Sequence, residues 1–309
     1  MSSNAHVPVL LGPVLEGLDI KQDGLYIDAT FGRGGHSAAI LQRLGANGRL
    51  IAIDRDPQAI AAAAPAVKSD SRCTLIRSDF AKLATCMRDM ALTGQADGLL
   101  FDLGVSSPQL DEPERGFSFL RDGPLDMRMD PDTGVSAAEW LQSVEEKELK
   151  KVLQSLGEET AASRIARAVV AARAQTPIRT TRQLADIVAS VVPAHVRKKH
   201  PATRTFQAIR MHINRELDQL RAALEQSLEV LKSGGRLCVI SFHSLEDRIV
   251  KRFMRDASRE AEQYRGMPDV PPAFRPKLRL VGRAITPTAE EVAQNARARS
   301  ARLRIAERV

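Results

Sequence analysis

The feature that most constrains the fold is a regular alternation, between residues 25 and 104, of short aliphatic or β-branched runs with alanine-rich stretches. The short runs have the composition of strands, and the alanine-rich stretches have that of helices. Such an alternation is typical of an α/β fold, in which helices cover a parallel sheet. The expected segments are strands at 25–30, 49–54, 73–78 and 98–102, and helices at 37–44, 57–67 and 80–92.

A fifth strand is expected much later, at 235–241. It follows a long helix over 215–231, which we expect to stop at Ser233-Gly234-Gly235 because glycine commonly ends helices. The residues between the fourth and fifth strands have no convincing strand pattern. Their periodicity predicts helices at 137–156, 159–174 and 181–192.

The simplest organisation is a sheet whose chain leaves after the fourth strand and later returns to complete it. We therefore predict a discontinuous α/β domain, residues 1–110 and 213–309. An all-helical domain, residues 111–212, is inserted into it.

Composition excludes several classes of protein. No run approaches 18 apolar residues, and no charged segment at the N-terminus leads into a long apolar run. We therefore expect neither a membrane span nor a secretory signal. The expected location is the cytoplasm. Cys73, Cys86 and Cys238 are widely spaced and form no CxxC pair. This pattern argues against a disulfide framework or a structural zinc site, and we expect no metal.

Charge is distributed unevenly along the chain. Residues 1–150 contain 15 Lys+Arg and 22 Asp+Glu, whereas residues 151–309 contain 30 and 16. Basic side chains gain affinity for nucleic acid by displacing counterions from phosphates. The second half therefore favours a polyanionic partner, although basic surfaces also occur in proteins that bind no nucleic acid.

A glycine-rich segment, DATFGRGGHS, leads from the first predicted strand into a helix. Glycines in this position let the backbone turn tightly and approach a ligand. A dinucleotide motif would continue Gly32 and Gly34 with a third glycine, where this chain has Ser37. Read as the loop of S-adenosylmethionine-dependent methyltransferases, the segment has Asp28 and two glycines, with Thr30 in the first glycine's place. The loop alone does not distinguish a dinucleotide from S-adenosylmethionine as the cofactor.

Acidic residues end the second and fourth predicted strands. Asp54 is positioned to accept hydrogen bonds from ribose hydroxyls, whereas a helix-capping role suits Asp56, which precedes proline. Phe80 follows the third strand and could pack against an adenine ring or against the core. Asp102 ends the strand LLFD and needs a partner, either a ligand or a local amide.

Six segments together resemble the MraW (RsmH) family of bacterial methyltransferases. They are HVPVLLGPVLEGL, DATFGRGGHS, DLGVSSPQLD with RGFSF and PLDMRM, TRTFQAIRMHINRE, ISFHSLEDRIVK, and RAITPTAEEVAQNARARSARLR. Members of the family use S-adenosylmethionine to methylate the exocyclic N4 of a decoding-centre cytidine in 16S ribosomal RNA.

The resemblance implies a Rossmann-like class I methyltransferase domain with an inserted all-helical domain. It also implies S-adenosylmethionine as the cofactor and 16S rRNA, within the small ribosomal subunit, as the partner. The inserted domain could equally recognise RNA or form a homodimer contact. The family's cofactor contacts fall on Gly34, Gly35, His36, Asp54, Phe80, Asp102 and Gln109.

The N4 lone pair of cytidine is delocalised into the ring, so the enzyme must align it with the methyl group and accept its hydrogen bonds. Many amino-methyltransferases do this with an Asp/Asn-Pro-Pro-aromatic motif, which this chain lacks after its fourth strand. We expect Asp102, or a group between Gly104 and Ser107 such as Ser106, to take this role. Phe117 or Phe119 could stack on the base.

His243 follows the fifth strand and begins a capping-box-like sequence, so it is a candidate substrate contact or proton relay, or a structural residue of the turn.

Basic residues that could contact RNA fall into three groups. The preferred group is the cluster of Arg197, Lys198, Lys199, His200 and Arg204. The second is Arg210, which shares a helical face with Asn214. The third is Arg297, Arg299, Arg302 and Arg304 near the C-terminus.

Three other functions remain open at this point. A nicotinamide-dependent oxidoreductase would explain the glycine loop and Asp54 but leaves the basic second half unexplained. A non-catalytic ribosome-assembly factor could have kept the fold. A methyltransferase acting on another RNA or DNA amino group would share the same cofactor site.

Overall fold

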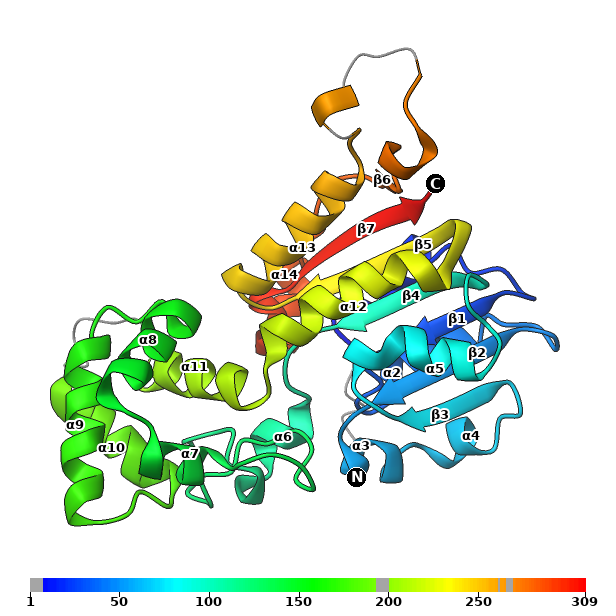
Figure 1. Cartoon of the computed structure of the whole chain (residues 1–309). Coiled ribbons are helices and arrows are strands. Elements are labelled where there is room, and N and C mark those ends of the chain that lie inside the picture. Colours follow the sequence, from blue (N-terminus) through cyan, green and yellow to red (C-terminus); the bar gives the residue numbers. More distant parts are fainter. Residues whose placement is uncertain (1–7, 193–199, 261, 265–268) are drawn as a thin grey trace. The chain divides into compact units, whose positions relative to one another are not determined.

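The computed structural model describes residues 8–192, 200–260, 262–264 and 269–309. The chain divides into two compact units, which are described separately. The sheet unit comprises Met1–Gly104 and Asp218–Val309, and the helical unit comprises Val105–Leu217 (Figure 1). From the sequence we placed these boundaries after residues 110 and 212.

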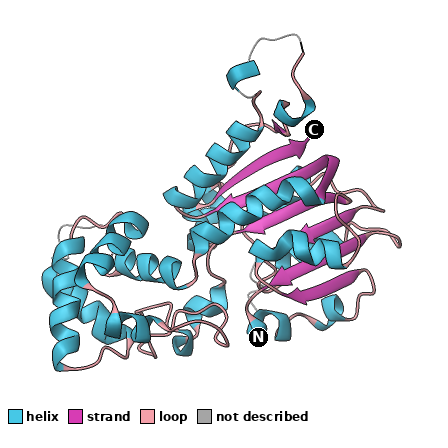
Figure 2. Ribbon diagram, in the orientation of Figure 1, coloured by secondary structure: helices cyan, strands magenta, loops and turns pink. Residues whose placement is uncertain are grey.

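The sheet unit is built on seven strands in the order β3-β2-β1-β4-β5-β7-β6 (Figure 2). Strands β1 to β5 are parallel, and β7 runs antiparallel between β5 and β6. The strands are β1 (Leu25–Asp28), β2 (Arg49–Asp54), β3 (Cys73–Arg77), β4 (Ala96–Asp102), β5 (Leu231–Ser241), β6 (Leu278–Leu280) and β7 (Arg302–Arg308). The five strands expected from the sequence are present, and β6 and β7 are additional.

The parallel strands are buried on both faces, which explains their nearly continuous apolar sequence. Ile27 is paired with Ile51 and with Leu99, and all three contribute to one core. The alternate residues Tyr26 and Leu50 face the opposite way and belong to a second core on the other side of the sheet.

Helices cover both faces of this sheet. They are α1 (Leu11–Gly17), α2 (Gly35–Leu41), α3 (Pro57–Ala61), α4 (Pro65–Lys68), α5 (Leu83–Asp89), α12 (Glu216–Val230), α13 (Ser244–Ala257) and α14 (Ala289–Gln294). Short 3₁₀ turns accompany them, among them η1 (Phe80–Lys82), η5 (Pro272–Phe274) and η6 (Ala296–Ser300).

Two sequence predictions for this unit were wrong in detail. The helix expected over 57–67 is broken, because Pro65 forces the preceding Ala64 into an extended conformation (ψ 142°). The helix expected to reach residue 231 ends at Val230, and Leu231 already pairs with Ala96 of β4. The glycines at 234–235 therefore lie within an irregular start of β5 and do not end the helix.

The helical unit packs its helices around one core. The helices are α6 (Ser107–Asp111), the 3₁₀ turn η2 (Pro113–Arg115), α7 (Ala137–Ser143), α8 (Glu146–Gly157), α9 (Ala162–Gln175), α10 (Thr181–Val191) and α11 (Thr203–Ile213). Leu141, Leu149, Ile165 and Leu184 are fully buried in that core. The single helix expected over 137–156 is two helices, because Val144 adopts an extended conformation (ψ 137°) between them.

None of the helices within the described ranges has the length and apolarity needed to cross a bilayer.

Candidate functional site

The chain order of the sheet reverses between β1 and β4, so the connections from these strands leave on opposite sides. In open α/β sheets, such a switch point opens a crevice at the carboxyl ends of the strands, where ligands bind. Three carboxylates end strands at this edge: Asp28 on β1, Asp54 on β2 and Asp102 on β4.

Asp28 holds the glycine-rich loop in shape. Its side chain accepts hydrogen bonds from the Thr30 N–H (3.2 Å) and from the Ser37 hydroxyl (2.7 Å). The Thr30 hydroxyl in turn accepts a hydrogen bond from the Asp102 N–H at 2.6 Å. The loop is therefore tied to both β1 and β4.

The glycines of this loop have conformations that other residues avoid. Gly32 and Gly34 have φ angles of 53° and 74°. A Cβ on Gly34 would lie 2.6 Å from the Phe31 ring, and one on Gly35 would lie 2.4 Å from Pro8. Packing against neighbouring residues thus requires glycine at positions 34 and 35, and the cofactor contacts predicted for Gly34 and Gly35 stay predictions.

Asp54 links β2 to the same loop. Its two carboxylate oxygens accept hydrogen bonds from the N–H groups of Gly32 (2.7 Å) and Asp56 (2.8 Å). Burial raises the pKa of Asp54 to about 6, although these hydrogen bonds act in the opposite direction. Asp56 is the N-cap of α3, where it accepts from the Gln58 N–H at 2.9 Å, so the capping role predicted for it is confirmed.

Asp102 has an unsatisfied acceptor. One carboxylate oxygen lies 3.5 Å from Nδ1 of His36, whereas the other is buried and has no hydrogen-bond partner among the described residues. Burial raises the pKa of Asp102 to about 6, while the nearby His36 opposes this rise. A buried carboxylate oxygen without a donor is suited to receive an N–H or O–H group of a ligand.

His36, predicted as a cofactor contact, is almost fully buried in the first turn of α2. Its two ring nitrogens face the Val9 carbonyl (3.1 Å) and the Asp102 carboxylate (3.5 Å). The ring therefore connects α2 and the N-terminal segment to Asp102. This pairing joins residues far apart in the sequence, and no local pattern indicated it.

Phe80 begins η1 and lies edge-on to Phe101, with ring centroids 5.8 Å apart. It is partly buried against the core, which is one of the two roles considered from the sequence. The neighbouring Asp79 lies 3.1 Å from Nε of Arg55, a residue that sequence reasoning did not single out.

Ser106 and Gln109 belong to the helical unit. Ser106 is the N-cap of α6, and its N–H donates a hydrogen bond to Oε1 of Gln109 at 2.9 Å. Gln109 is buried at this helix start. In the structure, this pair therefore caps the start of α6.

His243 is the N-cap of α13. Its Nδ1 accepts a hydrogen bond from the Glu246 N–H (3.4 Å), and its Nε2 lies 3.1 Å from the Glu246 carboxylate. The same carboxylate accepts from the N–H of Phe242 at 2.8 Å. These contacts correspond to the structural role in the turn that the sequence had offered as an alternative to a proton relay.

The predicted RNA-contacting residues have varied environments. Arg197, Lys198 and Lys199 lie outside the described residues. Arg204 donates to the Glu158 carbonyl at 2.8 Å while remaining exposed. His200 stacks on Phe119, with ring centroids 4.5 Å apart, so two candidates from different segments form one aromatic pair. Phe117, the other candidate for base stacking, is buried.

Arg210 and Asn214 are not the free polar face that their helical spacing suggested. Arg210 forms two hydrogen bonds of 2.7 Å with the Glu216 carboxylate, and both side chains are largely buried. Of the C-terminal arginines, Arg302 and Arg304 pair with Asp247.

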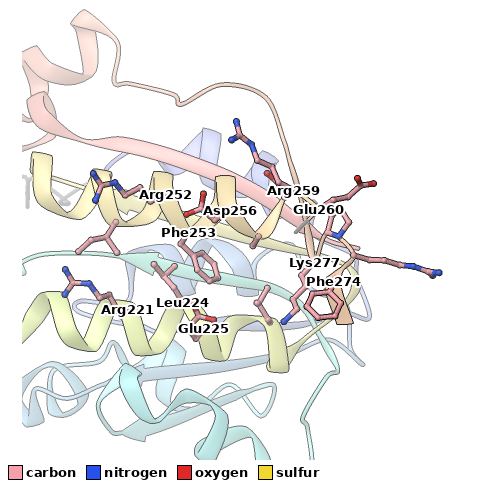
Figure 3. Close-up of a pocket in the computed structure, with 16 residues that line it drawn as sticks. Arg221, Leu224, Glu225, Arg252, Phe253, Asp256, Arg259, Glu260, Phe274 and Lys277 are labelled. Carbon is pink, nitrogen blue, oxygen red and sulfur yellow. The ribbon is translucent and has the colours of Figure 1, made fainter. Parts of the chain in front are cut away.

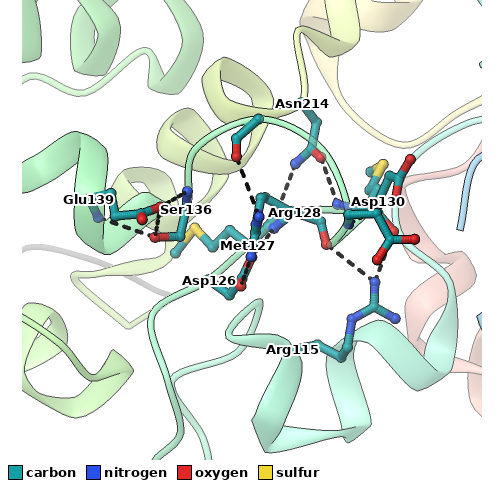
Figure 4. Close-up of polar contacts among 11 residues, drawn as sticks. Arg115, Asp126, Met127, Arg128, Asp130, Ser136, Glu139 and Asn214 are labelled. Carbon is teal, nitrogen blue, oxygen red and sulfur yellow. Dashed lines mark hydrogen bonds and ion pairs between the residues drawn. The ribbon is translucent and has the colours of Figure 1, made fainter.

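The side chain of Asn214 instead holds a loop of the helical unit (Figure 4). It donates to the Met127 carbonyl (2.7 Å) and accepts from the Met129 N–H (2.8 Å). Buried Arg115 donates to the carbonyls of Arg128 and Met129 from another direction. Met127 has a φ of 63°, an unfavourable conformation that these contacts maintain. Neither Arg115 nor Asn214 was predicted in this role.

No group of three or more His, Cys, Asp or Glu side chains is arranged to hold a metal ion in the part of the chain that the structure describes.

Comparison with known proteins places these features in a family. Residues 3–309 match the MraW methylase family. The ribosomal RNA small subunit methyltransferase H of Coxiella burnetii (strain Dugway 5J108-111) is 53% identical over 305 residues, which cover 99% of each chain. The homologue of the RSA 493 strain matches to the same extent. A solved rRNA methylase from Streptococcus thermophilus is 12% identical, with a TM-score of 0.44 over 99% of both chains. The chain belongs to the MraW methylase family.

Proposed function

We propose that this protein transfers a methyl group from S-adenosylmethionine to the exocyclic N4 of a cytidine in the decoding centre of 16S rRNA. The observation that carries the proposal is family membership along the whole chain, together with carboxylates at the switch point of the sheet. Its curated relatives in Coxiella burnetii are named as methyltransferases of small-subunit ribosomal RNA.

The residues at the carboxyl edge of the sheet suit this cofactor. Asp54 would accept hydrogen bonds from the ribose hydroxyls, and the loop from Gly32 to His36 would lie along the rest of the nucleoside. Phe80 would pack against the adenine ring. The unpaired oxygen of Asp102 supports the fit, because both the cofactor's ammonium group and an amino group of the substrate could donate to it. When bound, the cofactor supplies an electrophilic sulfonium methyl group.

Asp102 is the residue best suited to the reacting amino group. A carboxylate that accepts one N4–H hydrogen bond turns the nitrogen lone pair out of conjugation and toward the methyl carbon. Once methylated, the nitrogen would be positively charged and strongly acidic. With a pKa of about 6, Asp102 is largely ionised at neutral pH and can take the released proton, directly or through water.

Recognition of the RNA is assigned to the helical unit, through exposed Arg204, the Phe119–His200 pair and the basic residues 197–199. We propose the small ribosomal subunit as the physiological substrate and the cytoplasm as the location. A homodimer contact through the helical unit stays a prediction.

Transfer of labelled methyl groups to small ribosomal subunits, protein-free 16S rRNA and DNA tests this function. We expect labelling of rRNA at one cytidine, and its loss in Asp102→Ala with S-adenosylmethionine binding measured in parallel. Labelling of DNA alone would assign the protein to another amino-group substrate. A wild-type protein that fails to bind the cofactor would contradict the proposal.

A further inference from the structure

A second concave surface lies within the sheet unit, away from the carboxylates of the candidate site. It is a cavity of about 1170 Å³ between α12, α13 and residues 274–277, which we call the α12–α13 groove (Figure 3). Small-molecule sites commonly measure about 300–1,000 Å³. The groove lies slightly above this range, so it is large enough to hold a segment of a polymer.

The floor of the groove is apolar. Leu224, Leu228, Ile249 and Phe253 line it from the two helices and pack on the sheet core. Phe274 stands at one end, where it is 38% exposed and its ring packs at a tilt against that of Tyr264, with centroids 4.7 Å apart. An exposed aromatic ring at the edge of an apolar floor can stack against a flat partner such as a nucleobase.

The rim of the groove is rich in cations. Arg252, Arg259 and Lys277 are exposed, and among the described residues none of their side chains has an ion pair or hydrogen bond. Figure 3 shows Arg252 near one end of the groove and Lys277 beside Phe274 at the other. Basic groups at both ends, separated by an apolar floor, match a chain with repeated negative charges and flat rings between them.

Acidic residues also line the groove and limit the possible partners. Asp256 is paired with Arg255 at 2.7 Å. The groove is therefore lined by two other carboxylates, Glu225 and Glu260, and by the three cations without an ion pair described above. Carboxylates repel the anionic groups of any polyanionic partner, so a partner that fits the groove must also bring hydrogen-bond donors to them. An RNA strand offers 2′-hydroxyl and base amino groups that donate to carboxylates.

We infer that the α12–α13 groove binds a segment of single-stranded RNA remote from the target nucleotide. Arg252 and Lys277 contact its phosphates, and Phe274 stacks on one of its bases. This inference rests on the proposed function, because it assigns part of the recognition of the RNA substrate to the sheet unit.

Two matched double variants of the full chain test the phosphate contacts. The groove variant is Arg252→Gln with Lys277→Gln, and the control is Arg43→Gln with Arg49→Gln, which removes two exposed charges outside the groove. Binding to small subunits and to 16S rRNA is measured without cofactor over a range of salt concentrations. We expect the groove variant alone to bind more weakly, and its log–log salt slope to fall by about 1.4, or about 0.7 per lost single-strand phosphate contact.

Phe274→Ala tests the stacking contact. We expect RNA affinity to fall about 5- to 150-fold with an unchanged salt slope, because stacking on an aromatic side chain contributes about 1–3 kcal/mol per base. The KM for RNA should rise in both variants, while kcat and the Kd for S-adenosylmethionine stay at the wild-type values.

Equal RNA affinity and salt slope in the groove and control variants would overturn the inference. In that case, binding of an acidic peptide that depends on Arg252 and Lys277 would identify the groove as a peptide site. A wild-type protein that binds RNA through the groove without methylating it would refute the proposed function alone. Methylation that is insensitive to the groove variants would refute the groove alone.

Discussion

Asp102→Asn should make the cofactor-free protein more stable at neutral pH, even though it removes a site residue. Burial raises the pKa of Asp102 to about 6 from its ordinary value of 3.8, and its side chain is 27% exposed. The folded state therefore binds the proton more tightly than the unfolded chain. The stability from this group is full below pH 3.8 and is lost as the pH rises toward 6.

The magnitude follows from the size of the shift. About two pKa units at 1.36 kcal/mol each give a loss of about 3 kcal/mol at pH 8 relative to strongly acidic pH. About 2 kcal/mol of this loss falls between pH 4.5 and pH 8. Asparagine does not titrate, so the free energy of unfolding of the variant, relative to wild type, should rise by about 2 kcal/mol over this interval.

Urea unfolding of both proteins at several pH values between 4.5 and 8 measures this difference. Any constant effect of the new amide on packing cancels, because only the change with pH is compared. Asp89→Asn, at an exposed position in α5, controls for the loss of a carboxylate. A stability difference between Asp102→Asn and wild type that stays constant with pH would refute the reasoning.

Three further predictions concern the cofactor, a loop and an ion pair. The affinity for S-adenosylmethionine should fall below pH 6, by up to about tenfold per pH unit for one proton, because burial raises the pKa of Asp54 to about 6 and ribose hydroxyls donate to the carboxylate form. Calorimetry should show weaker binding and a flatter pH dependence in Asp54→Asn. Asn214→Ala should destabilise the helical unit by about 2–4 kcal/mol in urea unfolding, because it leaves the Met127 carbonyl and the Met129 N–H without the Asn214 side chain. A loss under 1 kcal/mol would mean that the loop over 125–130 does not need this support. Arg210→Gln should cost about 3 kcal/mol by leaving Glu216 buried without its partner, and should leave the salt dependence of RNA binding unchanged; a reduced salt slope would instead make Arg210 a phosphate contact.

The parallel strands could be predicted from sequence because burial on both faces gives them continuous apolar runs. Strand β7 (Arg302–Arg308) has no such run: its arginines alternate with Leu303 and Ile305, which is the pattern of a strand with one buried face and which a search for continuous apolar runs misses. Its place in the sheet depends on pairing with β5. The sequence had suggested this arginine-rich segment as an RNA contact. In the structure, Arg304 pairs with Asp247 of α13 and helps to dock the strand.

The candidate site was predictable where a residue's role follows from its place at a strand end. Asp54 and Asp102 both lie at the expected edge of the sheet. Contacts made across the fold were not predictable in this way. The approach of His36 to Asp102 depends on where α2 begins relative to β4, which no local pattern reveals.

Helical spacing also gave a wrong prediction for Arg210 and Asn214, because it takes no account of contacts with residues beyond the helix. Arg210 and Asn214 share a face of α11, but the turn at Arg215, with a φ of 51°, brings Glu216 back onto Arg210. Asn214 is used by a loop more than eighty residues away in the sequence. A spacing pattern can show which residues lie together, but not whether other parts of the chain have already engaged them.

The most direct measurement uses small ribosomal subunits whose cytidines carry ¹⁵N at the exocyclic amino group. The subunits are incubated with the protein and S-adenosylmethionine, and the nucleosides are analysed by mass spectrometry. We predict a methylated cytidine that releases ¹⁵N-labelled methylamine on deamination, and none with Asp102→Ala. A methylated cytidine that releases only labelled ammonia would place the methyl group on another atom and contradict the proposed reaction.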